Sequence, residues 1–187
     1  MRRRWLIACL LVPLAVVAAD IRMLTVEKED EAYVFDSWTY LAAPPADVFA
    51  VLLDYPQYPR ISSVYKESRY IEPAEDGRPR VYTRAEGCIL FVCREVIKIE
   101  ALHVTPHTHI SAVVEPEGSN LSDGRTDWWL EPEGDGTELH YRMSLTPAFW
   151  VPPLIGPFVI RIALKRAGSR AVVQLEQLAI ERHQAGE

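Results

Sequence analysis

The sequence has few clustered basic residues, few glycines and few cysteines, and each shortage excludes a class of protein. Outside Arg2, Arg3 and Arg4 there is no basic block, and 20 Lys plus Arg face 26 Asp plus Glu, for a net charge of −6. Because phosphate binding needs a clustered cationic surface, we expect no nucleic-acid partner. The 9 glycines and 14 prolines are too few and too dispersed for a low-complexity chain. The 187 residues fit one globular domain.

The first nineteen residues have the pattern of a secretory signal peptide. Three arginines precede an apolar run over residues 5–17, and Val17-Ala18-Ala19 offers small residues for cleavage. The run is shorter than the roughly 20 apolar residues of a membrane-spanning helix, so an uncleaved anchor is the weaker alternative. Lipidation of Cys9 is disfavoured, because only Trp5 separates its Leu6-Ile7-Ala8-Cys9 box from the arginines. We therefore expect a signal peptide over 1–19 and an exported, acidic domain over 20–187, in the bacterial periplasm.

Export changes the interpretation of the two remaining cysteines, Cys88 and Cys93, since an oxidising compartment favours a disulfide. In one continuous strand their Cα atoms would lie about 16 Å apart, too far for a bond that spans about 4.4 to 6.8 Å. A disulfide therefore requires residues 88–93 to fold back as a hairpin tip. The alternative is a single buried strand over 89–96 with two unreactive thiols, and the sequence leaves both open.

The rest of the chain predicts strands, a short helix and then a long helix. Aromatic residues predict a strand near 31–42, and Pro45 and Asp47 begin a helix that ends near Asp54. An irregular connection over 58–61 precedes a strand over 64–71. Five further strands are expected at 79–85, 94–103, 108–114, 125–130 and 137–145. Their close spacing without helices predicts an antiparallel meander of six or seven strands.

Residues 154–183 change from strand-like to helical periodicity. Apolar residues recur at three- and four-residue steps over 154–183, which predicts an amphipathic helix that packs on the sheet. Several inward positions are alanine, and Gly168 lies beside them. Small side chains either bring the helix close to the sheet or leave space between the two, and the sequence does not separate these outcomes.

This order of elements resembles the START-like, or SRPBCC, superfamily. The stretches that carry the likeness are 43–59, with Pro45-Ala46, Val48-Phe49, Asp54 and Tyr58-Pro59, then 128–132 and 136–141. Within the superfamily, the chain resembles the polyketide cyclase and coenzyme-Q-binding-protein families over about residues 31–182. The resemblance implies an α+β helix-grip fold, in which a curved antiparallel sheet wraps a long C-terminal helix and short helices follow the first strand. The leader and the Cys88/Cys93 pair depart from mitochondrial coenzyme-Q proteins.

The resemblance also implies a hydrophobic cavity between the sheet and the last helix. It would hold an apolar ligand such as a lipid, an isoprenoid quinone or a polyketide-like molecule. Each candidate would equally well pack a solid core. The candidates within the domain are Phe49, Leu52, Leu53, Ile61, Tyr82, Trp129, Ile160, Leu164 and Ala167.

Residues 147–158 combine four prolines with large apolar groups, including Phe149, Trp150 and Phe158. Prolines prevent a regular element there, so the apolar groups must find another apolar surface. The loop either packs on its own domain or lies at the mouth of the cavity, where it touches ligand or makes a transient membrane contact. The sequence favours neither strongly, and Phe149, Trp150 and Phe158 join the candidate ligand-binding residues.

Catalytic motifs are scarce in this chain. No Gly-x-Ser-x-Gly, phosphate-binding glycine loop or His-Glu-x-x-His is present. His103, His107 and His109 form the densest group of potential metal ligands, but strand-edge polar residues explain them equally well, so we predict no metal site and no cofactor. We therefore expect an exported binding or carrier protein for a hydrophobic molecule, without assuming enzyme activity. The alternatives are a cyclase or dehydratase that uses polar groups in the same cavity, and an envelope protein-interaction module.

Overall fold

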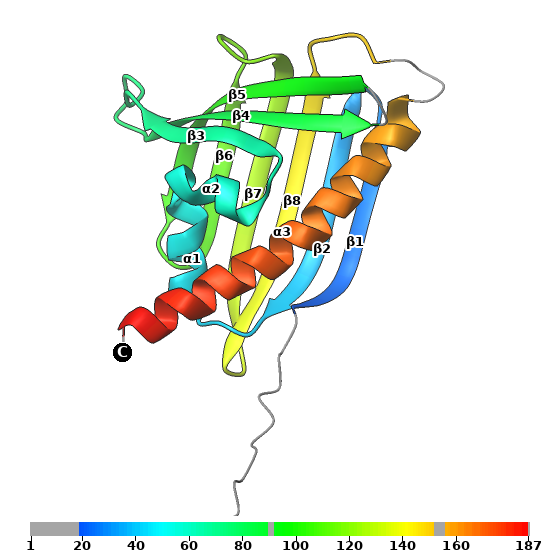
Figure 1. Cartoon of the computed structure of the whole chain (residues 1–187). Helices are drawn as coiled ribbons and strands as arrows, with labels where there is room; N and C mark the ends of the chain where they lie inside the picture. The colour runs from blue at the N-terminus through cyan, green and yellow to red at the C-terminus, as the bar shows by residue number, and fades with distance from the viewer. Residues whose placement is uncertain (1–18, 90–91, 152–155, 187) are drawn as a thin grey trace, which may run out of the picture.

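The computed structural model describes residues 19–89, 92–151 and 156–186, which form one sheet, one long helix and a short helical segment (Figure 1). The elements, in chain order, are β1 (Asp20–Glu29), β2 (Ala32–Leu41), α1 (Pro45–Leu53), the 3-10 turn η1 (Tyr55–Gln57), α2 (Tyr58–Ile61), β3 (Tyr65–Ile71), β4 (Arg80–Ile89), β5 (Val92–Thr105), β6 (His109–Glu115), β7 (Leu121–Glu133), β8 (Gly136–Pro147) and α3 (Gly156–Gly186). In the described ranges, no helix is both long enough and apolar enough to span a membrane.

The sheet confirms the predicted antiparallel meander and adds a strand to it. Its eight strands run in the order β1-β2-β8-β7-β6-β5-β4-β3, so β3 to β8 are sequential neighbours and β2 closes against β8. The expected helix-grip arrangement is therefore present, with a curved sheet that wraps α3 (Figure 1). The sequence missed β1, because only Val26 of this edge strand is buried and its charged residues hide the alternation.

The short helices after β2 follow from proline placement. Pro45 lies in the first turn of α1, where its missing N–H costs nothing, and Asp47 lies near the positive end of the helix. The prediction of an irregular connection over 58–61 was wrong, because these residues form the single turn α2 with Pro59 near its start. The Tyr58 hydroxyl donates to the Leu52 carbonyl at 2.7 Å and ties this turn to the end of α1.

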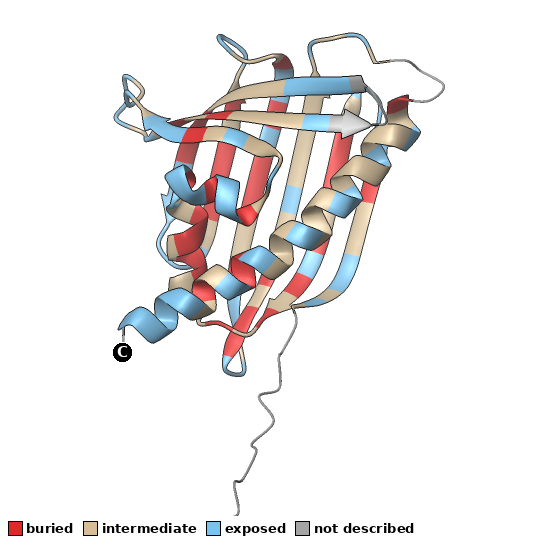
Figure 2. Cartoon of the chain, in the orientation of Figure 1, coloured by how far each residue is buried: buried red, intermediate tan, exposed pale blue. Residues whose placement is uncertain are grey.

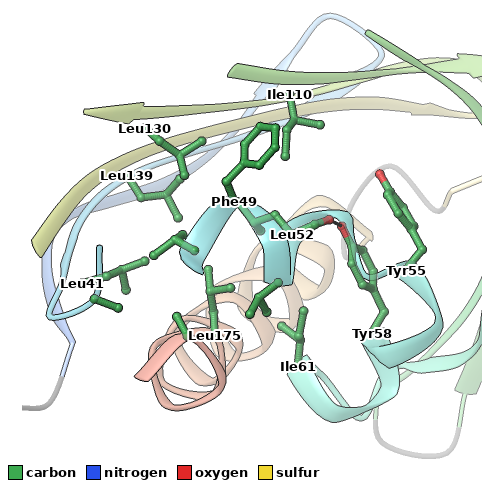
Figure 3. Close-up of a cluster of buried hydrophobic side chains, with 14 of the residues drawn as sticks. Leu41, Phe49, Leu52, Tyr55, Tyr58, Ile61, Ile110, Leu130, Leu139 and Leu175 are labelled. Carbon is green, nitrogen blue, oxygen red and sulfur yellow. Dashed lines mark hydrogen bonds between the residues drawn. The ribbon is translucent and has the colours of Figure 1, made fainter. Parts of the chain in front are cut away.

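The two halves of α3 differ sharply in burial (Figure 2). The C-terminal half places Leu175, Glu176 and Ala179 against the domain, each 5% exposed or less. Leu175 and Ala179 join the core where α1 and α2 fill the space between helix and sheet, and Figure 3 shows Leu175 there beside the α1 side chains. In the N-terminal half, apart from Gly156 in the first turn, the described residues are only partly buried or exposed. This half therefore covers something other than a packed core.

The β4–β5 hairpin decides one of the open alternatives. β4 ends at Ile89 and β5 begins at Val92, with Cys88 opposite Cys93 in the antiparallel register. The single continuous strand over 89–96 was therefore wrong, and the backbone fold-back that a disulfide requires is present. The Cys88–Cys93 bond itself stays a prediction.

Candidate ligand cavity

A cavity of about 230 Å³ lies between the N-terminal half of α3 and the concave face of the sheet, and it is open to solvent on one side. Strands supply most of its wall, α1 and α2 close one end, and α3 forms its cover. The lining residues are Phe35, Ser37, Leu52, Tyr58, Ile61, Ser62, Val64, Tyr65, Ala85, Val96, Lys98, Trp128, Leu139, Tyr141, Met143, Leu145, Leu164, Ala167, Gly168, Ala171, Val172 and Leu175.

The small residues of α3 explain why space remains. Ala167, Gly168 and Ala171 line the cavity at positions three and four residues apart, so their short side chains share one face of the helix. Gly168 brings the helix backbone close to Phe35, since a Cβ at this position would lie 2.5 Å from the ring. The helix therefore touches the sheet at Gly168, while the short side chains of Ala167 and Ala171 leave space beside this contact. Neighbouring side chains do not fill that space.

One charged pair interrupts the apolar wall. Lys98 and Glu100 alternate with outward residues on β5, so both face inward, and Nζ of Lys98 lies 2.8 Å from Oε1 of Glu100. Their side chains are 12% and 2% exposed. Burial lowers the pKa of Lys98, but the carboxylate of Glu100 raises it more, so the net pKa is above its ordinary value. The amine therefore stays an ammonium at neutral pH.

Three of the lining residues are tyrosines, and their hydroxyls stay protonated at neutral pH. Burial raises the pKa of Tyr58 and Tyr141 well above the ordinary value, and it also raises the pKa of Tyr65. The carboxylate of Glu100 adds to each effect. The Tyr141 hydroxyl donates to the sulfur of Met143 at 3.2 Å, which is a weak acceptor. Tyr65 and Tyr141 therefore supply neutral O–H donors to a largely apolar wall, while the Tyr58 hydroxyl already donates to the Leu52 carbonyl.

The structure brings together four of the predicted ligand-binding residues. Leu52, Ile61, Leu164 and Ala167 line the cavity. Phe49 and Leu53 instead belong to the packed core, where the Phe49 ring lies 5.2 Å from the His107 ring. Ile160 lies on α3 outside the lining. The expectation that Phe49, Leu53 and Ile160 border the cavity was therefore wrong. For Phe49 and Leu53 the reason is that α1 turns most of its apolar face toward the packed core between α3 and the sheet.

Two expected residues lie on the opposite face of the sheet. Tyr82 packs under Arg69, whose guanidinium carbon is 4.8 Å from the ring centroid. Trp129 stacks between His140 and His109, at 4.7 and 5.2 Å. Adjacent strand residues point to opposite faces, so its neighbour Trp128 lines the cavity instead. The prediction that Tyr82 and Trp129 face the cavity was therefore wrong. Their side chains point to the convex face of the sheet, and only the residues next to them in each strand point to the concave face.

The proline-rich segment does not line the cavity where the structure describes it. Phe149 is partly buried, while Trp150 and Phe158 are 74% and 66% exposed. None of the three belongs to the cavity wall. The placement of these residues at the cavity mouth is therefore not supported, and two of them instead present large apolar groups to the surroundings.

The convex face carries a second hollow, of about 240 Å³, lined by Trp38, Trp129, Glu131, Glu138 and His140. Its aromatic rings are already stacked within the protein, because Trp38 stacks on His140 at 4.1 Å and Trp129 stacks on both His109 and His140. Glu138 pairs with Arg22 at 2.7 Å. Since these contacts are made within the protein, the concave cavity is the stronger candidate for a ligand.

The three clustered histidines of the sequence separate in space. His103 contacts Arg78 at 2.8 Å, His107 lies in a turn with φ of 62°, and His109 pairs with Asp127 at 3.0 Å. Within the ranges that the structure describes, no three His, Cys, Asp or Glu side chains gather as metal ligands do.

Sequence reasoning missed most of the strand residues in the wall. Tyr141, Met143 and Leu145 occupy alternate positions of β8, and Val96 and Lys98 do so on β5. Alternation along each strand would have grouped them, but only the register of the sheet decides which group faces inward. Lys98 in particular has no apolar character that would mark it as an inward residue.

Comparison with known proteins agrees with this geometry. Residues 35–179 match the family model described as "Polyketide cyclase / dehydrase and lipid transport". The chain belongs to this family. A search of curated proteins returned no match.

Solved structures resemble this family member in fold at low sequence identity. The Zhui aromatase/cyclase from Streptomyces sp. R1128 superposes with a TM-score of 0.67 at 14% identity, covering 83% of this chain and 98% of that one. A START superfamily protein from Mycobacterium smegmatis gives a TM-score of 0.61 at 18% identity, with coverages of 78% and 98%. Human STARD10 gives 0.62 at 11% identity, with coverages of 86% and 74%. The fold is therefore START-like, of the kind that serves hydrophobic-ligand binding or polyketide cyclisation.

Proposed function

We propose that this family member is an exported carrier that holds a hydrophobic small molecule in the cavity between α3 and the sheet. The observation that carries the proposal is the cavity itself, whose wall is almost entirely carbon and whose cover contributes alanine and glycine. The open side gives a ligand a path of entry, and transfer of apolar groups from water supplies the driving force. Membership of a family described for polyketide chemistry and lipid transport supports the same reading.

The size of the cavity favours a small ligand or part of a larger one. A volume of about 230 Å³ exceeds the roughly 150 Å³ that suffices to hold benzene, and lies below the roughly 300 Å³ at which pockets for drug-sized ligands begin. One fused ring system or a short length of acyl chain fits inside, and any remainder passes through the open side. Burial of about ten methylenes gives about 8 kcal/mol, opposed by at least about 4 kcal/mol of association cost. The resulting moderate affinity suits both uptake and release.

The test is the identity of what the protein carries. Native mass spectrometry and solvent extraction of the purified protein, followed by binding to a panel of quinones, fatty acids and phospholipids, should reveal at least one ligand. Ala167→Leu combined with Ala171→Leu fills the cavity and should abolish that binding. Lys165→Leu with Gln174→Leu places the same two leucine side chains at exposed positions of α3, outside the cavity lining, and should leave binding intact. A protein without co-purified ligand or panel binding would refute the carrier role.

Catalysis in the same cavity is the second candidate, and the buried Lys98–Glu100 pair is the observation that favours it. An ammonium beside a bound carbonyl polarises that group, and dehydration or cyclisation of a polyketide-like substrate begins with such polarisation. Mass spectrometry of a bound ligand before and after incubation tests the idea. Loss of water from the ligand in the presence of the protein, and not with Lys98→Met and Glu100→Gln combined, would establish turnover.

We also propose that the chain is secreted to the periplasm and that Cys88 and Cys93 are bonded there. The leader pattern over 1–19 and the facing register of the two cysteines support this. The N-terminal sequence of protein purified from an envelope fraction should begin near Asp20. Titration of thiols in the unfolded, unreduced protein should find none in the mature chain, whereas two free thiols would remove the disulfide.

Delivery of a lipid-like ligand implies a transient membrane contact, and the exposed Trp150 and Phe158 support it. Large apolar groups that remain in water favour insertion into an interface. Binding to phosphatidylcholine and phosphatidylglycerol vesicles should fall when both residues are changed to Ser. Equal vesicle binding by the unchanged and the double-variant protein would count against this contact.

A further inference from the structure

The buried ion pair gives the cavity one polar corner. Lys98 lines the cavity from β5, while Glu100 is flanked across the sheet by Val81 and Val114 and has almost no exposure. Replacing such a pair by apolar residues is often neutral or stabilising, so stability alone is a poor reason for its presence. The pair therefore points to a ligand that uses it.

The corner has hydrogen-bond donors to spare. An ammonium has three N–H donors, and within the described ranges Nζ of Lys98 makes a hydrogen bond only to Glu100. Thr83 on β4 lies opposite Lys98 in the sheet, and Ser68 on β3 lies opposite Thr83. Both hydroxyls are buried without a hydrogen-bond partner in the part of the chain that the structure describes. Buried polar groups are ordinarily satisfied, so this row next to Lys98 has unused hydrogen-bonding capacity, although neither Thr83 nor Ser68 lines the cavity.

The tyrosines next to this corner add donors of the same kind. Tyr65 and Tyr141 line the cavity, and Glu100 acts electrostatically on both. Their raised pKa values keep both hydroxyls protonated. Among the residues that the structure describes, the Tyr141 hydroxyl bonds only to the Met143 sulfur, and a ligand oxygen would be a better acceptor. The corner thus presents N–H and O–H donors toward an acceptor atom.

Charge decides which acceptor fits. Glu100, at 2.8 Å, already neutralises Lys98, so the corner carries no net charge of its own. A carboxylate ligand would bring a second, unbalanced negative charge beside Glu100 into an apolar wall, which is costly. A neutral carbonyl oxygen accepts the same hydrogen bonds without that cost.

We propose that the cavity selects an apolar molecule bearing one neutral carbonyl oxygen, and that Nζ of Lys98 donates a hydrogen bond to this oxygen. The inference rests on the proposed cavity function and names the chemical class of its ligand. A ketone, quinone or ester satisfies it, whereas a free fatty acid and a plain hydrocarbon do not. A ligand without this oxygen would leave the donors buried and unpaired. The free-energy cost of those unpaired donors weakens its binding, so one hydrogen-bonded oxygen is enough for selection.

Three probes with the same ring system and similar size test the inference: acetylnaphthalene, ethylnaphthalene and naphthoate, titrated against the fluorescence of the full mature protein. Acetylnaphthalene should bind about tenfold more tightly than either of the others, the difference expected for one hydrogen bond. Equal binding of the acetyl and ethyl compounds, or tighter binding of naphthoate, would overturn the inference and leave the cavity function standing. If none of the three binds although the protein binds a member of the lipid and quinone panel, the inference is overturned and the cavity function stands; if nothing in the panel binds either, both fail.

A double variant then assigns the preference to the ion pair. Lys98→Met with Glu100→Gln removes both charges together, so that neither is left unpaired, and should abolish the acetyl preference while ethylnaphthalene binds as before. Arg69→Met with Glu67→Gln removes an exposed pair of the same i,i+2 spacing, 3.0 Å apart, and should keep the preference. Retention of the tenfold preference in the Lys98/Glu100 variant would overturn the role of Lys98. The three-probe comparison on the unchanged protein remains decisive if that variant fails to fold.

Discussion

The two ends of the space between α3 and the sheet are built from the same elements and have opposite properties. At one end, Leu175 and Ala179 of α3 meet α1 and the sheet in a packed core, and Leu175 marks the boundary where this core meets the cavity. At the other end, Ala167, Gly168 and Leu164 of the same helix cover a hollow. The difference arises because α1 and α2 occupy only the first end and because α3 supplies small residues at the second. A helix on a curved sheet therefore leaves a cavity wherever no third element fills the gap.

The largest expected effect is on the free energy of unfolding, when a leucine of α3 is truncated to alanine at each end. Leu175→Ala removes side-chain volume from the packed end and should lower the free energy of unfolding by about 2–5 kcal/mol. Leu164→Ala lies over the hollow, where partial exposure leaves little packing to lose, and should cost about 1 kcal/mol or less. Urea denaturation of both variants measures the contrast. Equal losses would show that the open end is packed as tightly as the closed one.

A smaller effect should come from the closest approach of helix and sheet. Gly168→Ala places a methyl group where Phe35 already lies, so the ring must move. Overpacking costs about 1–3 kcal/mol and exceeds the roughly 1 kcal/mol gained from helix propensity, so we expect a net loss of about 1 kcal/mol. Gly186→Ala, near the end of α3, meets no neighbouring atom and should be neutral or stabilising. A stabilised Gly168→Ala protein would contradict the close contact.

The two sides of the sheet should differ in ligand binding at adjacent residues. Trp128→Ala removes a wall of the cavity and should weaken binding about tenfold, or about 1.4 kcal/mol. Trp129→Ala removes the stack with His140 and His109 on the convex face and should leave affinity unchanged. Isothermal titration with whichever ligand the protein carries compares the two. A loss confined to Trp129→Ala would place the binding site on the outer face.

The last effect, which grows with each pH unit, should appear at alkaline pH. Burial raises the pKa of Tyr58 and Tyr141 well above 10, so the folded protein keeps protons that the unfolded chain releases. Stability from these groups is complete below about pH 10 and declines above it, by at most about 1.4 kcal/mol per pH unit for each tyrosine. Denaturation at stepped pH values measures the slope, and Tyr141→Phe should make it shallower. An identical slope in that variant would exclude a contribution from Tyr141.

Prediction from sequence succeeded where the pattern is local and strong. The start of α1 at Pro45, the extent of α3 and seven of the eight strands follow from proline placement and periodicity. It failed for β1, whose single buried residue leaves no alternation to detect, and for Trp129, whose face depends on a register set by β6 and β8. Four of the twelve candidate ligand residues line the cavity, because apolar character alone does not separate a filled end from a hollow one.

The sequence by itself determined the meander, the long helix and the small residues at 167, 168 and 171, since each is encoded within a few neighbouring positions. Only the tertiary structure decided that a hollow lies over those residues and that Lys98 lines it. Both depend on how far α1 reaches and on which face of β5 turns inward, and these are properties of elements distant in the chain that meet only in the folded protein.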